Sequence, residues 1–337
     1  MDLKQLCEIN APSGNEFALR RLLLQEAQTL LGGENVRIDR MGNLLCHIKG
    51  TEVGHPHVCV SAHMDEVGFL IMGATDEGLL RFRPIGGIDP RVIISKRVLV
   101  GENELPGVIG AIAIHLQTRA DSEKVLGYDD LYIDIGAKDK AEALEKCPPG
   151  SYACFSAPYM PFGDGFVCAK ALDDRVGCHT LLQLMQDSYP GDVTLAFVTR
   201  EEVGMRGSYG AAFGLQPDIV INLEGTAAND LGCVDSQFEV CRAGAGVAVS
   251  FMDNSSIYQR RLYKKLMHLA DKNRIAHQVK RGVTAVNDAA HYQRAAGGAL
   301  ACTLSVPCRY IHSGASVCAL SDVQAQYELT RAFLLNA

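Results

Sequence analysis

The sequence has 337 residues, of which 47% are hydrophobic and 21% are charged. This length indicates one large domain or two of moderate size, and so much apolar side chain excludes disorder as the main state. The formal net charge is -7, only 7% of the residues are aromatic, and no basic tract is present. A nucleic-acid-binding protein is therefore not expected.

The two ends of the chain and its cysteines indicate a cellular compartment. The start, Met1-Asp2-Leu3, lacks the basic residues and the apolar stretch of a signal peptide. No window holds the roughly 18 consecutive apolar residues that span a bilayer. The twelve cysteines are scattered, none has C-x-x-C spacing, and several lie within apolar runs. We expect buried free thiols, a cytoplasmic location and no membrane partner.

The N-terminal segment predicts a helix that leads into a sheet. Residues 13–16 fit a helix capping box, the apolar residues of 17–31 supply one helix face, and Gly32-Gly33 ends the helix. The last of the strands that follow is mostly apolar, as expected in a sheet that is buried on both faces. The expected strands are 36–38, 43–48 and 57–62.

Between about Gly68 and Phe166 the sequence is rich in short β-branched runs, which are separated by Gly and Pro. Runs of this kind predict a compact β-domain, either a small barrel or a sandwich. The expected strands include 91–94, 98–100, 107–112 and 131–135.

After Phe166 the alternation of helix and strand returns. This pattern predicts one α/β layered domain made of residues 1–67 and 167–337, into which the β-domain 68–166 is inserted. The expected elements are a helix over 174–186, strands over 193–198 and 218–223, a helix over 257–272, a strand over 300–306 and a final helix that Ser321 caps and that runs to Leu335.

Acidic residues and histidines recur at the edges of these elements, mostly just past a buried strand. In an open α/β sheet, sites form at the carboxyl ends of the strands. Each cluster alone has an ordinary structural explanation, such as a helix cap or a solvated loop. Their recurrence at one kind of position favours a shared site. The clusters are His63-Met64-Asp65, Asp173-Asp174, Glu201-Glu202, Glu224 and His312.

The residue types in these clusters suit a pair of divalent cations. Two imidazoles and three carboxylates can hold two zinc-like ions that share one carboxylate. A metal pair can activate a water and polarise a carbonyl group, while one further carboxylate moves protons. Glu201 and Glu202 offer one ligand and one base, and Asp65 is placed to hold the far ring nitrogen of His63.

Four motifs carry a resemblance to a known family. In sequence order, they closely resemble the motifs of the glutamyl/deblocking aminopeptidases (metallopeptidase family forty-two), some of which carry an older endoglucanase label. The segments 39–43 and 134–137 are similar to further family signatures, so the resemblance covers nearly the whole chain. The motifs are Ala62–Gly68, Lys170–Arg175, Glu201–Gly207 and Arg309–Ser313.

The resemblance implies a three-layer α/β catalytic domain of the phosphorylase/hydrolase-like type, with an inserted β-barrel that controls substrate access or oligomerisation. It implies two divalent ions per subunit, zinc, cobalt or manganese, with Asp173 bridging them and often a cis peptide bond after it. Glu201 is then the general base and acid, and Asp65 the partner of His63. The implied ligands are His63, Asp173 and Glu224 for one ion and Asp173, Glu202 and His312 for the other.

The same resemblance implies short peptide substrates and self-assembly, often into a tetrahedral dodecamer. Two departures bear on specificity: the family usually has Asp where this chain has Glu224, and Gly-Gly-Thr-Asp where it has the stretch 284–288. We expect removal of the N-terminal residue from peptides. The alternatives are a related metal-dependent deacylase or carboxypeptidase, a glycosidase with two carboxylates and no metal, and a non-enzymatic metal-stabilised assembly module.

Overall fold

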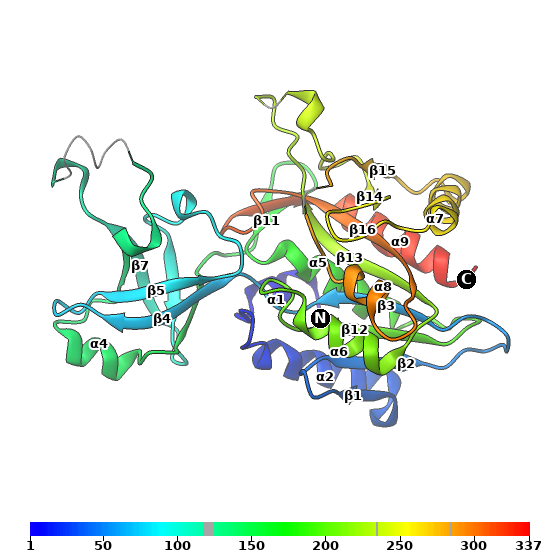
Figure 1. Ribbon diagram of the computed structural model, residues 1–337, viewed down its shortest axis with the longest axis horizontal. Helices are drawn as coiled ribbons and strands as arrows, with labels where there is room; N and C mark the ends of the chain where they lie inside the picture. The colour runs from blue at the N-terminus through cyan, green and yellow to red at the C-terminus, as the bar shows by residue number, and fades with distance from the viewer. Residues whose placement is uncertain (117–123, 234, 284) are drawn as a thin grey trace.

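A computed structural model describes residues 1–116, 124–233, 235–283 and 285–337. Thr284, the first residue of the stretch 284–288, lies outside the described residues. The chain forms an α/β part around an 11-stranded sheet, and beside it a closed six-stranded barrel (Figure 1). This architecture confirms the expected α/β fold with a small β-barrel.

The large sheet has the strand order β1-β2-β12-β3-β13-β16-β17-β11-β10, and β14 and β15 are attached beside β16. Its strands are β1 (Val36–Ile38), β2 (Leu44–Ile48), β3 (Val58–His63), β10 (Met160–Phe162), β11 (Phe166–Ala169), β12 (Val193–Val198), β13 (Ile219–Ala227), β14 (Val247–Ser250), β15 (His277–Lys280), β16 (Leu300–Arg309) and β17 (Ser316–Ala319).

Helices cover both faces of this sheet. The helices of the described chain are α1 (Leu3–Glu8), α2 (Phe17–Leu31), α4 (Lys140–Lys146), α5 (Leu172–Leu184), α6 (Arg206–Leu215), α7 (Arg260–Asn273), α8 (Ala289–Arg294) and α9 (Leu320–Leu334).

Alternate side chains of the central strands enter two separate cores. In β3, Val58 and Val60 pack with residues of α2, α5, α7 and α9, whereas Cys59 packs with residues of α6 and α8. In β12, Leu195 and Ala196 divide in the same way. The sheet is therefore the middle of three layers, which explains why its central strands read as nearly continuous apolar runs.

The barrel has the strand order β4-β5-β8-β7-β6-β9, and all its pairings are antiparallel. Phe69 lies at its centre, with edge-to-face contacts to Phe82 and Phe155 at ring distances of 5.2 and 5.3 Å. The barrel strands are β4 (Gly68–Ala74), β5 (Leu80–Ile85), β6 (Arg97–Val100), β7 (Leu105–Ala111), β8 (Leu131–Asp134) and β9 (Tyr152–Phe155).

One expected barrel strand is wrong. Residues 91–94 lie at a short 3-10 helix, Pro90–Val92, and in the turn after it. The side chain of Asp89 accepts a hydrogen bond from Arg91 N at 2.9 Å, and Asp-Pro favours such a turn. Only Ile93 of the run enters the barrel core, so the β-branched composition predicted a strand where local turn chemistry decides.

The expected helix caps are also wrong, although the helices exist. Helix α2 starts with no side-chain cap, because Ser13 Oγ donates to Asp65 Oδ2 at 2.6 Å instead. Ser321 lies inside α9, whose N-cap is Ala319. Helix α1, which the sequence analysis missed, is capped by Asp2 and Gln5.

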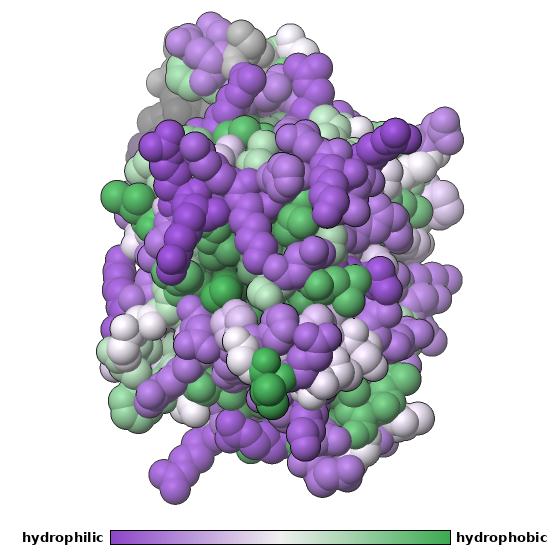
Figure 2. All heavy atoms as spheres, turned by 90° about the vertical axis from the view of Figure 1, so that its right-hand side faces the viewer, coloured by the Kyte–Doolittle hydropathy of each residue, from purple (hydrophilic) through white to green (hydrophobic). Residues whose placement is uncertain are grey.

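The end of the molecule far from the barrel presents mostly hydrophilic side chains, with apolar residues in separate small groups (Figure 2). Among the described residues, no helix has both the length and the apolar character needed to cross a membrane. All twelve cysteines are free, and all but Cys233 are buried. The expectation of buried free thiols is thus correct except at Cys233.

Candidate active site

Parallel pairing brings several of the clusters to one edge of the large sheet. His63 ends β3 and pairs with Val198, which ends β12, so the Glu201-Glu202 pair follows directly beside it. Strand β13 runs parallel to β3 on its other side and carries Glu224. Asp173 lies at the start of α5, and His312 lies in the connection between β16 and β17.

These side chains form two groups that share Asp173. Its Oδ1 lies 3.3 Å from His63 Nε2, and its Oδ2 lies 3.4 Å from His312 Nε2. Glu224 Oε2 completes the first group at 3.6 Å from His63 Nε2, and Glu202 Oε1 completes the second at 3.2 Å from His312 Nε2. Each group presents three donor atoms within 4.8 Å of one another, an arrangement that could hold a metal ion. The peptide bond between Asp173 and Asp174 is cis.

Backbone carbonyl groups orient both imidazoles. His63 Nδ1 lies 3.0 Å from the carbonyl oxygen of Asp65, and His312 Nδ1 lies 2.8 Å from that of Gly87. A carbonyl oxygen can only accept a hydrogen bond, so each Nδ1 carries the proton. Each Nε2 faces Asp173 and is the ring nitrogen left to ligate a metal, once a bound ion displaces the proton that the carboxylates favour there.

The charge balance of the site favours added cations. Burial lowers the pKa of His63, but contact with the carboxylates of Asp173 and Glu224 outweighs burial and raises it well above its usual range. Burial also raises the pKa of Glu224 to about 6. His63 Nε2 and Glu202 Oε1 are buried and make no hydrogen bond. The donor set of imidazoles and carboxylates thus fits a pair of zinc-like ions.

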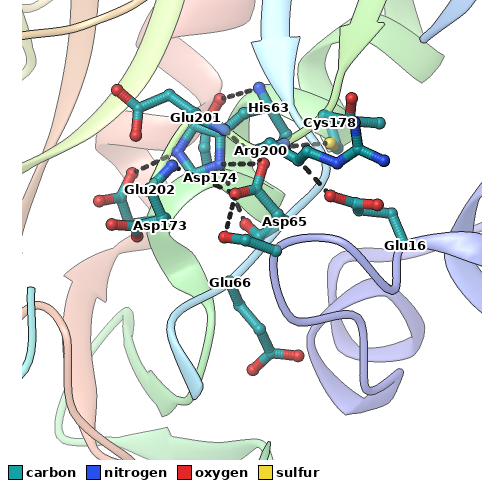
Figure 3. A network of polar contacts seen from close by, with 12 residues as sticks. Glu16, His63, Asp65, Glu66, Asp173, Asp174, Cys178, Arg200, Glu201 and Glu202 are labelled. Atoms are coloured by element: carbon teal, nitrogen blue, oxygen red, sulfur yellow. Dashed lines mark hydrogen bonds and ion pairs between the residues drawn. The ribbon is translucent and has the colours of Figure 1, made fainter. Parts of the chain in front are cut away.

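Glu201 belongs to neither group. Its side chain extends to the same side as those of Glu202 and Asp173, away from Asp65 (Figure 3). Burial, followed by the charge of Glu224, raises the pKa of Glu201 well above its usual range. A carboxylate with a raised pKa at the edge of a metal site is suited to exchange protons with a substrate.

The carboxylate of Asp65 has a different partner from the expected one. We expected it at His63 Nδ1, but its Oδ1 lies 3.7 Å away, and the backbone carbonyl of Asp65 is closer. The carboxylate instead accepts hydrogen bonds from Glu201 N at 3.0 Å and Glu202 N at 3.2 Å. Asp65 therefore orients His63 through its main chain and the two glutamates through its side chain.

Three further residues, which were not predicted from the sequence, support this centre. Glu16 Oε1 accepts a hydrogen bond from Arg200 N at 3.2 Å, next to the glutamate pair. Asn43 Oδ1 accepts one from Thr199 N at 3.0 Å and so anchors the end of β12. Gly87 belongs to the segment that forms the barrel, so this segment orients His312. Asn43 lies in a motif noted above, but no signal in the sequence pairs Glu16 or Gly87 with the site.

A cavity of about 400 Å³ opens onto the centre. Its wall includes Asp173, Glu201, Glu202, Glu224 and His312. The remaining wall is largely apolar or backbone, and Asn287 and Lys280 add polar groups. The cavity is large enough to enclose an amino-acid residue next to the candidate ligands.

Comparison with known proteins identifies similar chains. The profile described as M42 glutamyl aminopeptidase matches residues 42–329. The lysyl aminopeptidase of Pyrococcus furiosus is 28% identical over 343 residues, which cover 98% of this chain and 95% of that protein.

Solved structures of similar chains extend over the whole fold. Aminopeptidase APDkam598 of the archaeon Desulfurococcus kamchatkensis has a TM-score of 0.94 and 31% identity, and the match covers 99% of this chain and 94% of that one. The TET1 peptidase of Pyrococcus horikoshii, which can assemble into a tetrahedron or a large octahedral shell, has a TM-score of 0.88 and 33% identity, with 99% and 98% covered.

Proposed function

The chain belongs to the M42 glutamyl aminopeptidase family, and from this premise we propose that it is a dinuclear metal-dependent aminopeptidase with Glu201 as its general base. Membership makes the protein a peptide hydrolase, which excludes a non-enzymatic assembly module. The observation that carries the proposal is the position of Asp173, whose two carboxylate oxygens face His63 and His312 separately. One carboxylate can therefore serve both ions.

The proposed ligands are His63, Asp173 and Glu224 for one ion and Asp173, Glu202 and His312 for the other. When bound, two zinc, cobalt or manganese ions supply Lewis-acid chemistry that acidifies a water and polarises the scissile carbonyl group. At Glu224 the resemblance implies Asp; Glu224 Oε2 lies 3.6 Å from His63 Nε2 and so stays within ligand reach despite the extra methylene.

The residues of the chain do the remaining work. Glu201 takes a proton from the attacking water and later delivers it to the leaving amine. Asp65 holds the backbone of Glu201 and Glu202, so that the base and a ligand keep a fixed relation. The largely apolar wall of the cavity excludes water from the reacting peptide bond.

We further propose that residues 1–67 and 167–337 form the catalytic domain and that the inserted segment 68–166 serves substrate access or subunit contacts. A homo-oligomer is expected because the related TET1 peptidase assembles into closed shells, and a tetrahedral dodecamer is one such form. The free cysteines support a cytoplasmic location.

Metal removal tests the proposal. Chelated protein should lose hydrolysis of aminoacyl p-nitroanilides, and zinc, cobalt or manganese should restore it with two ions per chain by elemental analysis. N-acyl amino acids assayed in parallel test the deacylase and carboxypeptidase alternatives. Cleavage of these compounds alone, or activity that survives complete chelation, would refute the aminopeptidase.

A further inference from the structure

Two lysines of the described chain are buried, and within the described residues only one of them forms an ion pair. Lys170 is 3% exposed and its Nζ lies 2.7 Å from Glu66 Oε1. Lys280 is 4% exposed, and within the described residues it forms no ion pair with a carboxylate. Burying an ammonium group without a counter-charge is unfavourable. The position of Lys280 therefore requires a reason other than an internal ion pair.

Lys280 lies on the wall of the cavity at the candidate active site. It ends strand β15, where it pairs in parallel register with Ser250 at the end of β14. The same cavity is lined by Glu201 and by four of the five candidate metal ligands, Asp173, Glu202, Glu224 and His312. Val240, Val286 and Ile311 add apolar surface to its wall. Away from Glu201 and the candidate metal ligands, a residue bound at the active site thus meets one ammonium group beside apolar side chains.

We propose that Lys280 is a specificity-determining residue that binds the side-chain carboxylate of an acidic N-terminal residue, Glu or Asp. This inference rests on the proposed aminopeptidase function. The substrate would supply the partner that Lys280 lacks, in the way that Glu66 supplies it to Lys170 inside the fold. The apolar wall suits the methylene groups of a glutamyl side chain.

Selectivity follows from the alternatives to an acidic residue. A leucyl residue would leave the ammonium group of Lys280 buried and unpaired, and a lysyl residue would add a second positive charge next to it. The preference for an acidic residue is the difference in binding free energy between it and a leucyl or lysyl residue. A hydrogen-bonded pair that involves charged groups corresponds to a preference of roughly 10- to 100-fold.

The terminal carboxylate of a dipeptide has the same chemistry, so the test separates the two sources. The metal-loaded enzyme is assayed with the p-nitroanilides of α-Glu, Leu and Lys, which have no terminal carboxylate, and with the dipeptide Leu-Gly, whose only carboxylate is terminal. The variants are Lys280→Met, Lys280→Gln and the matched control Arg281→Met. Arg281 is the next residue and is exposed, and it does not line the cavity.

Wild-type enzyme should prefer the Glu substrate, and Lys280→Met and Lys280→Gln should lose about 10- to 100-fold in kcat/KM on it. The Leu substrates should lose far less, and Arg281→Met should behave as wild type. Equal losses on all substrates with a lowered Tm would show a structural role and overturn the inference. A loss confined to Leu-Gly would show that the terminal carboxylate is bound and would also overturn it. If wild-type enzyme cleaves Leu p-nitroanilide but not the Glu substrate, this inference fails while the aminopeptidase stands; if it cleaves none, the proposed function itself fails.

Discussion

The side chain of Asp65 is hydrogen-bonded to the main chain of Glu201, with Oδ1 3.0 Å from the amide nitrogen. Its Oδ2 accepts from the next amide, that of Glu202, at 3.2 Å, and from Ser13 Oγ at 2.6 Å. A carboxylate has two acceptor oxygens and no donor, so it can satisfy both amides at once. The buried side chain of Asp65 therefore holds the backbone of the loop that carries the proposed base, Glu201, and the proposed ligand, Glu202.

Replacing Asp65 with Asn should disturb this loop. An amide side chain offers one acceptor oxygen, so its NH2 group must face one of the two backbone N–H groups. We expect kcat/KM for an aminoacyl p-nitroanilide to fall about 10- to 100-fold, as is usual for groups that support metal ligands. Ser13→Ala is the control, because it removes one hydrogen bond worth about 1 kcal/mol and leaves both amides paired. Asp65→Asn enzyme that matches Ser13→Ala in activity would contradict the role.

Replacement by Gln should have different effects at the two adjacent glutamates, Glu201 and Glu202. Glu201→Gln removes the base but no ligand, so both metals should stay bound while kcat falls by about 100- to 10,000-fold. Glu202→Gln replaces a ligand, so elemental analysis should show the loss of one ion. Metal content and kcat measured side by side separate the two roles. A Glu201→Gln variant that loses metal, or that keeps full turnover, would contradict the assignment of the base.

The sheet and the strand-end clusters could be predicted from the sequence because their signals are local. The sequence predicts strand 193–198 with the bounds that it has, because a mostly apolar run between polar ends is typical of a strand buried on both faces. Parallel strands end at one edge, so His63 and the Glu201-Glu202 pair were expected to meet there, and they do.

The supporting contacts could not be predicted, because they join segments that are distant in sequence. Gly87 and His312 are 225 residues apart, and their hydrogen bond uses a backbone carbonyl that any residue would offer. Glu16 fits a helix cap locally, yet its carboxylate accepts from Gly14 and from Arg200, 184 residues away. In both cases tertiary packing determines the partner, and local residue type carries no signal of it.

The stability of the protein should depend on pH through the buried carboxyl group of Asp288. This side chain is fully buried, and neither carboxylate oxygen makes a hydrogen bond. Burial, followed by the charge of Glu224, raises the pKa of Asp288 to about 8, whereas an unfolded chain has a pKa of about 3.9. Between these values the folded state holds a proton that the unfolded state has lost, so the stability that Asp288 contributes falls as pH rises.

Asp288→Asn removes the carboxyl group that binds this proton, so folding of the variant is no longer coupled to its uptake. The stability of the variant relative to wild type should therefore rise from pH 5 to pH 8, by at most about 1.4 kcal/mol per pH unit. Thermal unfolding of both proteins after chelation of metal, at each pH, measures the difference, and comparison within one pH cancels the titration of shared groups. Two Tm curves that stay parallel across this range would show that Asp288 titrates alike in both states.

Lys170 is a buried lysine with a structural role, so its replacement should lower stability and leave substrate preference unchanged. Its Nζ lies 2.7 and 2.8 Å from the two carboxylate oxygens of Glu66, and Arg175 Nη2 lies 3.4 Å from Glu66 Oε1. Lys170→Met leaves that carboxylate with a single, longer ion pair in a region closed to water. Breaking a buried pair from one side costs about 3–5 kcal/mol, so Tm should fall clearly, with no change in the order of substrate preference.

The double variant Lys170→Met with Glu66→Gln separates the missing pair from the missing side chain. Glutamine is uncharged, so the double variant contains no buried charge that has lost its partner. Because the two residues are in direct contact, the double variant should be more stable than the sum of the two single changes predicts. Lys280→Met is the opposite case: it removes an ammonium group with no internal partner, and Tm should not fall. If Lys170→Met retains the wild-type Tm, the pair with Glu66 contributes no net stability, and the contrast between the two lysines does not hold.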